Sequence, residues 1–171
     1  INKKISITKK DKVLCAKHRK GHFEGVLAVV SRLLSNIHSR YIYLGEKDFQ
    51  QVYLIKKYLQ KKFSTKIVSC KTVRNKNQLP LSSRNNLLNK NELKRSEKIS
   101  KILFQFKKKI ILNFRNIGLL NYYKNKINKL CDKIEYFELR NKINLSSKVN
   151  KSNFKIFVAY KINKIRLIDN I

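Results

Sequence analysis

The order of apolar patterns between residues 23 and 69 constrains the fold of this chain more than any other feature of its sequence. Residues 23–37 place apolar side chains at helical spacing, and residues 41–44 form a short apolar run typical of a buried strand. A second helical pattern covers residues 48–59, and residues 66–69 have the pattern of a second strand. Because helices and strands alternate, the pattern predicts an α/β fold with a parallel sheet.

In such a sheet, ligands bind beyond the carboxyl ends of the strands, which places the turn at residues 45–48 in a site. Gly45 is expected to permit a tight turn and a close approach of the backbone to a ligand. Lys47 can neutralise a phosphate or a carboxylate. Asp48, the predicted N-cap of the following helix, can accept hydrogen bonds from ribose hydroxyls. From these residues alone, an ordinary capped surface turn is the favoured alternative.

Two further segments have the composition of ligand-binding loops. Residues 81–85 (LSSRN) combine two hydroxyls with a guanidinium, which suits a polyphosphate. Residues 19–25 (RKGHFEG) place a cation, an imidazole and two glycines at the entry to a helix, where a carboxylate can dock. Each pattern alone also fits an ordinary Ser-rich loop or an ordinary helix entry.

The only proline of the chain lies within residues 78–86, which show no periodic pattern and are expected to connect two domains. We place the boundary near Asn86, which gives domains of residues 1–86 and 87–171. Beyond it, the sequence predicts an α+β unit with a small antiparallel sheet. The predicted helices are residues 92–113 and 119–131, and the predicted strands are residues 136–139, 154–160 and 165–168.

The formal net charge of +31 raises nucleic acid or an anionic membrane surface as a partner. Most of the 41 basic residues are Lys, however, and the chain is also crowded with Asn and Ile, as codons rich in A and T would produce. Selected nucleic-acid surfaces favour the forked contacts of Arg. We therefore interpret the charge as compositional and expect no nucleic-acid partner. A basic RNA-binding protein, which predicts tight and salt-sensitive binding, is the competing class.

The three cysteines, Cys15, Cys70 and Cys131, are odd in number and show no paired spacing, which argues against disulfides and against a zinc site. No residue is assigned as a metal ligand. No run approaches the roughly 18 apolar residues of a membrane span, and the N-terminus lacks the apolar core of a signal peptide. The sequence therefore predicts a cytoplasmic protein that does not associate with a membrane.

Read in order, the segments RKGHFEGV, GEKDFQQ, LSSRN and RLIDN resemble those of the pantothenate synthetases, also called pantoate-beta-alanine ligases. The spacing between GEKDFQQ and LSSRN is highly specific, and YFELR at residues 136–140 resembles the C-terminal domain of that family. The resemblance implies the second half of a Rossmann-type nucleotidyl-transferase domain, followed by a small α+β C-terminal lid domain. The chain would then be the C-terminal part of such an enzyme.

The resemblance also implies an activity. Members of the family join pantoate to β-alanine with ATP, through a pantoyl adenylate, and release pyrophosphate and AMP. The product, pantothenate, is a precursor of coenzyme A. Mg²⁺ is implied as the companion of ATP, and a homodimer is implied for the full-length enzyme. A catalytically inactive remnant is the alternative to this activity.

By matching position, the resemblance assigns two catalytic residues, Lys47 at the reacting phosphate and Arg84 at the pyrophosphate. Gln51 and Arg19 match pantoate-binding positions, whereas His22 receives no catalytic role. Adenine is expected at the backbone of Val73, one of the ATP-binding positions. These positions are Gly45, Glu46, Lys47, Asp48, Val73, Leu81, Ser82, Ser83 and Arg84.

The Pro-Thr-Met-Gly turn of the family and the paired histidines after it are absent from the 171 residues, as is a second pantoate-binding glutamine. We therefore expect this chain alone to be inactive in adenylation. A fragment of a whole enzyme is the preferred explanation, ahead of an enzyme split into two polypeptides and of a decayed gene.

Overall fold

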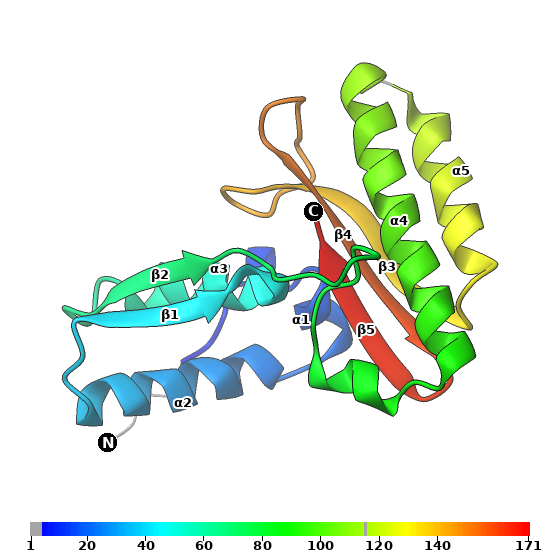
Figure 1. Ribbon diagram of the computed structural model, residues 1–171. Helices are drawn as coiled ribbons and strands as arrows, with labels where there is room; N and C mark the ends of the chain where they lie inside the picture. The colour runs from blue at the N-terminus through cyan, green and yellow to red at the C-terminus, as the bar shows by residue number, and fades with distance from the viewer. Residues whose placement is uncertain (1–4, 115) are drawn as a thin grey trace. The chain divides into compact units, whose positions relative to one another are not determined.

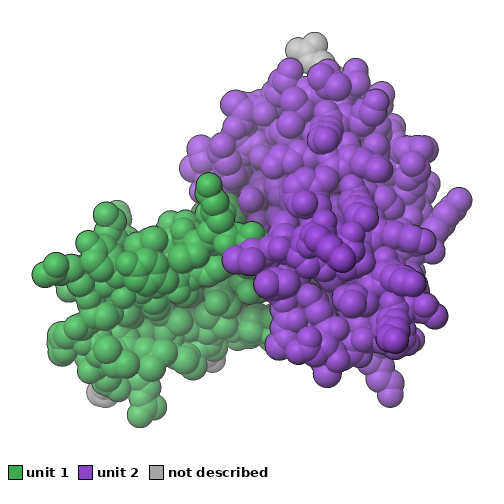
Figure 2. All heavy atoms as spheres, viewed as in Figure 1, with its two compact units in different colours: residues 1–72 green, residues 73–171 purple. Residues whose placement is uncertain are grey.

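The computed structural model describes residues 5–114 and 116–171, which form two compact units (Figure 2). The division falls between Thr72 and Val73. The sequence places the domain boundary later, near Asn86, and that assignment stays a prediction. No helix within the described ranges is both long and apolar enough to cross a membrane.

The first unit contains a two-stranded parallel sheet and two main helices (Figure 1). Tyr41 lies opposite Lys66 and Gly45 lies opposite Cys70, so the expected parallel pairing is confirmed. The expectation that residues 41–44 form a buried strand is wrong, because the side chains of Tyr41 and Tyr43 are exposed on the described structure. Helix α3 (Phe49–Leu59) packs against strand β1 (Tyr41–Gly45) and against helix α2 (His22–Asn36). The elements are η1 (Lys9–Asp11), α1 (Cys15–His18), α2 (His22–Asn36), β1 (Tyr41–Gly45), η2 (Glu46–Asp48), α3 (Phe49–Leu59) and β2 (Lys66–Cys70). The buried apolar side chains of the two main helices are Phe23, Leu27, Leu34, Val52, Leu54, Ile55 and Leu59.

The start of the chain is more structured than its polar sequence indicates. Two short helical turns, η1 and α1, precede α2, and Asp11, Leu14 and Cys15 are buried within this segment. Leu14 adopts a φ of 49°, in the sparsely populated left-handed region. Helices of three or four residues carry no detectable periodicity, so contacts with the rest of the unit must fix this conformation.

The second unit is the predicted α+β unit. Its strands form an antiparallel sheet in the order β3-β4-β5, against which both helices pack. The ring of Phe106 lies 5.2 Å from the rings of Tyr123 and Phe137, so both helices and the sheet share one core. The elements are η3 (Ser83–Leu87), α4 (Lys90–Leu112), α5 (Ile117–Asn128), β3 (Lys133–Asn141), β4 (Phe154–Ile162) and β5 (Ile165–Asn170).

Helix α4 begins earlier than the apolar pattern predicts, because its first turn is held by a capping box. The side chain of Asn89 accepts hydrogen bonds from the backbone N–H groups of Asn91 and Glu92, each at 3.0 Å. The carboxylate of Glu92 accepts in return from the backbone N–H of Asn89 at 2.8 Å. The Asn-x-x-Glu spacing of Asn89 and Glu92 indicates the start of a helix, which the apolar pattern alone does not.

Candidate functional site

The first candidate segment lies where the topology predicts. Strand β1 ends at Gly45, the single turn η2 holds Glu46, Lys47 and Asp48, and α3 begins at Phe49. This turn therefore follows the carboxyl end of a parallel strand, which is the edge at which α/β sheets bind their ligands.

Gly45 does not have the conformational role that the sequence indicates. Its φ of −71° and ψ of 129° are extended values open to any residue, so the expectation that glycine permits the turn is wrong. A Cβ atom at this position would meet nothing within 4 Å. Neither backbone conformation nor packing within the described chain requires glycine here. The open space beside Gly45 is, however, what a close-lying ligand would need.

Asp48 also differs from its predicted role. It precedes α3 at the N-cap position, but its side chain accepts no hydrogen bond from the helix. Its carboxylate is exposed. The prediction of a side-chain cap is therefore wrong, and this acceptor stays available to another donor.

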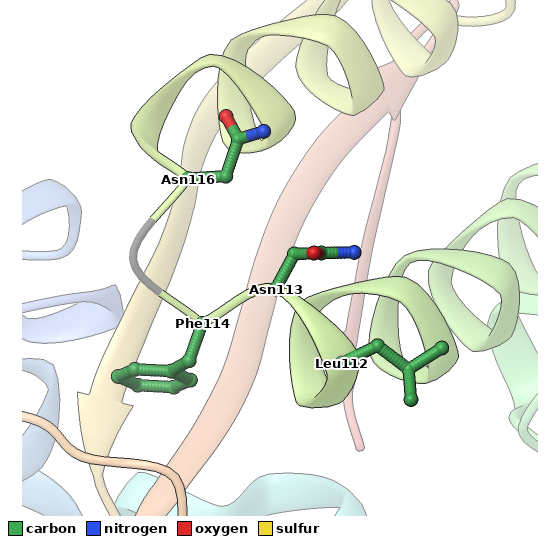
Figure 3. A pocket seen from close by; sticks show the side chains of 4 residues that line it. All are labelled: Leu112, Asn113, Phe114 and Asn116. Carbon is green, nitrogen blue, oxygen red and sulfur yellow. The ribbon is translucent and has the colours of Figure 1, made fainter.

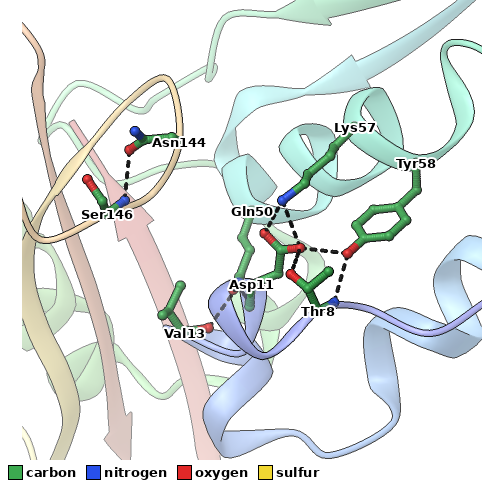
Figure 4. A network of polar contacts seen from close by, with 8 residues as sticks. All are labelled: Thr8, Asp11, Val13, Gln50, Lys57, Tyr58, Asn144 and Ser146. Carbon is green, nitrogen blue, oxygen red and sulfur yellow. Dashed lines mark hydrogen bonds and ion pairs between the residues drawn. The ribbon is translucent and has the colours of Figure 1, made fainter.

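The two adjacent glutamines of α3 have different surroundings. Gln50 is buried, and its side-chain amide donates to the carbonyls of Asp11 at 3.1 Å and Val13 at 2.7 Å (Figure 4). Its carbonyl oxygen accepts from the backbone N–H of Ala16 at 3.3 Å. Gln51 is only partly buried, and its amide enters none of these bonds. Gln50 thus anchors residues 11–16 to α3, whereas Gln51 takes no part in these contacts.

An ion-pair network anchors the same segment to α3 about two turns further along (Figure 4). The buried carboxylate of Asp11 accepts from the ammonium of Lys57 at 2.7 Å, the hydroxyl of Tyr58 at 2.6 Å and the hydroxyl of Thr8 at 2.8 Å. Burial alone would raise the pKa of Asp11, but these hydrogen bonds outweigh it and lower the pKa below its ordinary value. Burial likewise opposes the charge of Lys57, but the bond to Asp11 raises its pKa.

Arg19 lies in the tight connection that follows this anchored segment. It occupies the C-cap of α1, and its carbonyl accepts from the backbone N–H of His22 at 3.2 Å. Gly21 has a φ of 75°, a left-handed conformation that L side chains rarely adopt. Contacts of Gln50 and Asp11 hold the segment that precedes Arg19, and Gly21 turns the chain after it. The position of Arg19 therefore depends on both.

The remaining candidate residues belong to the second unit and begin with a hairpin-like loop, residues 73–81. The backbone N–H of Leu81 donates to the carbonyl of Val73 at 2.9 Å, and Arg74 pairs with Pro80 in an isolated antiparallel bridge. The loop therefore brings together the two positions that the family resemblance assigns to adenine and to the phosphates. Because a carbonyl has two lone pairs, this bond leaves Val73 able to accept another.

The serines and Arg84 follow directly in η3. Ser82 caps this turn, since its hydroxyl accepts from the backbone N–H of Arg84 at 3.3 Å. Ser83 and Arg84 are both exposed. The Arg84 guanidinium donates to the carbonyl of Arg166 at 3.2 Å and pairs with no carboxylate in the described part of the chain. Its charge is therefore available to an anion.

Sequence reasoning missed the residues that hold this loop in place. Arg74 forms a two-pronged pair with the buried carboxylate of Asp169, at 2.7 and 2.8 Å. The side chain of Asn75 donates to Glu97 at 2.8 Å. Asp169 belongs to the RLIDN segment, and a carboxylate directly after the apolar pair Leu167 and Ile168 was the signal that could have indicated a buried partner.

A surface hollow lies at the connection between α4 and α5, where Leu112, Asn113, Phe114 and Asn116 line it (Figure 3). None of the candidate residues lines this hollow. Among residues 5–114 and 116–171, no group of three or more His, Cys, Asp or Glu side chains is arranged to hold a metal ion.

Comparison with known proteins gives consistent results. The family model described as Pantoate-beta-alanine ligase matches residues 2–171. The pantothenate synthetase of Francisella tularensis subsp. mediasiatica is 41% identical over 159 residues, covering 92% of this chain and 53% of the relative. That of Flavobacterium psychrophilum is 38% identical over 159 residues, covering 91% and 56%. The chain thus spans about half the length of the curated relatives it matches.

Solved structures show the same relationship. A pantothenate synthetase from Thermus thermophilus has a TM-score of 0.87 and 24% identity, and the match covers 98% of this chain and 62% of that one. A pantoate-beta-alanine ligase from Francisella tularensis, complexed with beta-gamma ATP and beta-alanine, has a TM-score of 0.78 and 38% identity over 98% and 56% of the chains. The expected fold, the second half of a nucleotidyl-transferase domain with a small α+β domain, is confirmed.

Proposed function

The chain belongs to the pantoate-beta-alanine ligase family, and from that premise we propose that it supplies the C-terminal part of an enzyme that joins pantoate to β-alanine with ATP. The observation that supports this most strongly is the state of residues 45–48. Gly45 leaves open space that the fold does not need, and Asp48 presents a carboxylate that the adjacent helix does not use. Both features suit a nucleotide at the end of β1.

In the proposed first step, a carboxylate oxygen of pantoate attacks the α-phosphorus of ATP, which forms pantoyl adenylate and releases pyrophosphate. Lys47 would offset the charge at the reacting phosphate, and Arg84 would offset the charge of the departing pyrophosphate. The nucleotide would be held by Gly45, Glu46 and Asp48 at the ribose side, by the backbone of Val73 at adenine, and by Leu81, Ser82 and Ser83 at the phosphates. Mg²⁺ would accompany ATP, because this ion binds mainly through substrate phosphates.

In the proposed second step, the amine of β-alanine attacks the acyl carbon of the adenylate, which gives pantothenate and AMP. Gln51 and Arg19 would hold pantoate, one through an amide and the other through a guanidinium. These roles require positioning and charge stabilisation rather than acid–base chemistry.

We place the enzyme in the cytoplasm as a homodimer, and sedimentation of the purified enzyme would show a monomer if the dimer is wrong.

A chimaera tests this function directly. In it, the present chain replaces the matching part of the Francisella tularensis relative, to which it is 41% identical. We expect pantothenate and AMP to form from pantoate, β-alanine and ATP. We also expect exchange of labelled pyrophosphate into ATP that requires pantoate but not β-alanine, because the adenylate forms before the amine reacts. The unsubstituted relative is the positive control. A folded chimaera that makes no pantothenate would overturn the proposal, and exchange that requires β-alanine would overturn the intermediate.

Replacing Gly45 by alanine should separate stability from binding in the same chimaera. Because the backbone at Gly45 is ordinary and its surroundings are open, we expect alanine to raise the free energy of unfolding by about 0.4–1 kcal/mol. The added methyl group should nevertheless weaken ATP binding by about tenfold or more, since it displaces the nucleotide from hydrogen-bond distance. Urea denaturation and equilibrium titration with ATP measure the two effects.

Gly25→Ala, within α2, is the control for the stability measurement, because glycine inside a helix is less favourable than alanine by about 1 kcal/mol. An unchanged ATP affinity in Gly45→Ala would show that the nucleotide does not occupy the space beside residue 45.

A further inference from the structure

The Arg74 guanidinium connects three parts of the second unit. It donates to both carboxylate oxygens of Asp169 in β5, at 2.7 and 2.8 Å. It also donates to the carbonyl of Gln78, at 2.8 Å within the 73–81 loop, and to the carbonyl of Asn170, at 3.1 Å. Its carbon lies 5.2 Å from the centre of the Phe104 ring in α4. One side chain thus joins the loop to the sheet and to a helix.

This ion pair is largely removed from water. The Arg74 side chain is 13% exposed and that of Asp169 is 3% exposed. A planar fork that meets a carboxylate with two parallel bonds fixes orientation as well as distance, which a lysine ammonium does not. The pair therefore determines where the loop lies on β5, not merely that it lies there.

Hydrogen bonds within the loop also hold its conformation. The side-chain oxygen of Asn75 accepts from the backbone N–H groups of Asn77 at 2.9 Å and Leu79 at 3.0 Å, which closes the tip. The bond from Leu81 to Val73 closes the open end at 2.9 Å. A displacement at Arg74 would consequently move both ends of the loop together.

Strand β5 also contacts the segment beyond the loop. The Arg84 side chain donates to the carbonyl of Arg166, at the start of RLIDN, while Arg74 binds Asp169 near its end. Residues 73–84 are thus bonded to this one segment near both of its ends. RLIDN therefore supports the proposed nucleotide-binding residues, although none of its own residues is assigned to the nucleotide.

We propose that Arg74 and Asp169 are positioning residues for ATP: their pair sets the placement of the adenine contact at Val73 relative to the phosphate loop at residues 81–84. The proposal rests on the proposed function. Neither side chain touches the nucleotide, and both act through the 73–81 loop. The alternative is a pair that only stabilises the second unit.

Conservative variants distinguish these roles. Arg74→Lys keeps the charge and loses the fork, and Asp169→Asn keeps the shape and loses the charge. In the chimaera, each should raise KM for ATP by about 10- to 100-fold, because small displacements of binding groups have effects of this size. KM for β-alanine should stay unchanged. In the 171-residue chain, each should also speed hydrogen exchange at the Leu81 amide, a measurement that requires no activity.

Arg140→Lys is the matched control, since Arg140 pairs with Glu138 at 2.7 Å in the same unit and does not contact the loop. The decisive variant is Arg74→Leu with Asp169→Leu, because an apolar pair can replace a buried ion pair without loss of stability. If the double variant has the melting temperature of the unsubstituted chimaera but still has a raised KM for ATP, the positioning role is supported. If both its melting temperature and its KM for ATP equal those of the unsubstituted chimaera, the positioning role is overturned.

The two proposals can fail separately. An unsubstituted chimaera without activity would count against the proposed function. The present inference would still predict faster hydrogen exchange at the Leu81 amide in the single variants of the 171-residue chain. Exchange at Leu81 that stays at the parent rate in both Arg74→Lys and Asp169→Asn would show that the pair does not hold the loop, and the inference would be wrong.

Discussion

Replacing Arg84 by alanine should slow pantoate-dependent pyrophosphate exchange in the chimaera by about 10²- to 10³-fold, the usual effect of removing one donor that stabilises developing charge. Arg84 is exposed, its guanidinium donates to the backbone carbonyl of Arg166 at 3.2 Å, and it has no carboxylate partner among the described residues. Its guanidinium can therefore turn to a phosphate without breaking an ion pair. Rates measured at saturating and at limiting ATP show whether the loss lies in kcat or in KM.

Two further variants make this prediction specific. Arg84→Lys keeps the charge without the fork and should recover part of the rate. Arg95→Ala is the control, because Arg95 belongs to the same unit, is 37% exposed in its side chain and pairs with Asp132 at 3.0 Å. It should leave the rate within about twofold, as surface ion pairs contribute little. If Arg84→Ala retains the rate of Arg95→Ala, the assignment of Arg84 to the pyrophosphate is wrong.

The sequence predicted the regular elements because each has a pattern of its own. Residues 23–37 and 48–59 carry a helical period, and the short apolar runs at residues 41–44 and 66–69 are typical of parallel strands. The order of these patterns then predicts which end of β1 carries a site. These patterns determined where the elements lie but not how deeply they are buried, since Tyr41 and Tyr43 of β1 are exposed.

The sequence did not predict the contacts that join distant segments. Gln50 and Gln51 are adjacent and identical in type, yet only Gln50 is buried against the start of the chain. Arg74 and Arg84 are both loop arginines, yet only Arg74 has a carboxylate partner among the described residues. The difference depends on what each side chain meets after folding, which spacing does not contain. Gly45 shows the converse, since the tight turn predicted to require glycine there is absent and the space beside the residue is open.

The Asp11 network gives the largest expected effect on stability. Asp11→Ala should lower the free energy of unfolding of the chain by about 3 kcal/mol, because removing one member of a buried, hydrogen-bonded ion pair costs about 3–5 kcal/mol. We expect the lower end of that range, since the Lys57 side chain is 39% exposed and can return to water while that of Asp11 is 2% exposed. Urea denaturation at neutral pH, followed by a signal from the first unit, measures the loss.

The pH dependence identifies the cause. The pKa of Asp11 is lower in the folded chain than its ordinary value, so its contribution is complete above the unfolded pKa of about 3.9 and disappears as the pH falls through the folded value. The difference between the parent chain and Asp11→Ala should therefore shrink from neutral pH toward about pH 2. Asp48→Ala is the matched control, because that exposed carboxylate caps no helix and should change stability little at either pH. A difference for Asp11→Ala that stays constant over this range would mean that lost packing, rather than the ion pair, destabilises the variant.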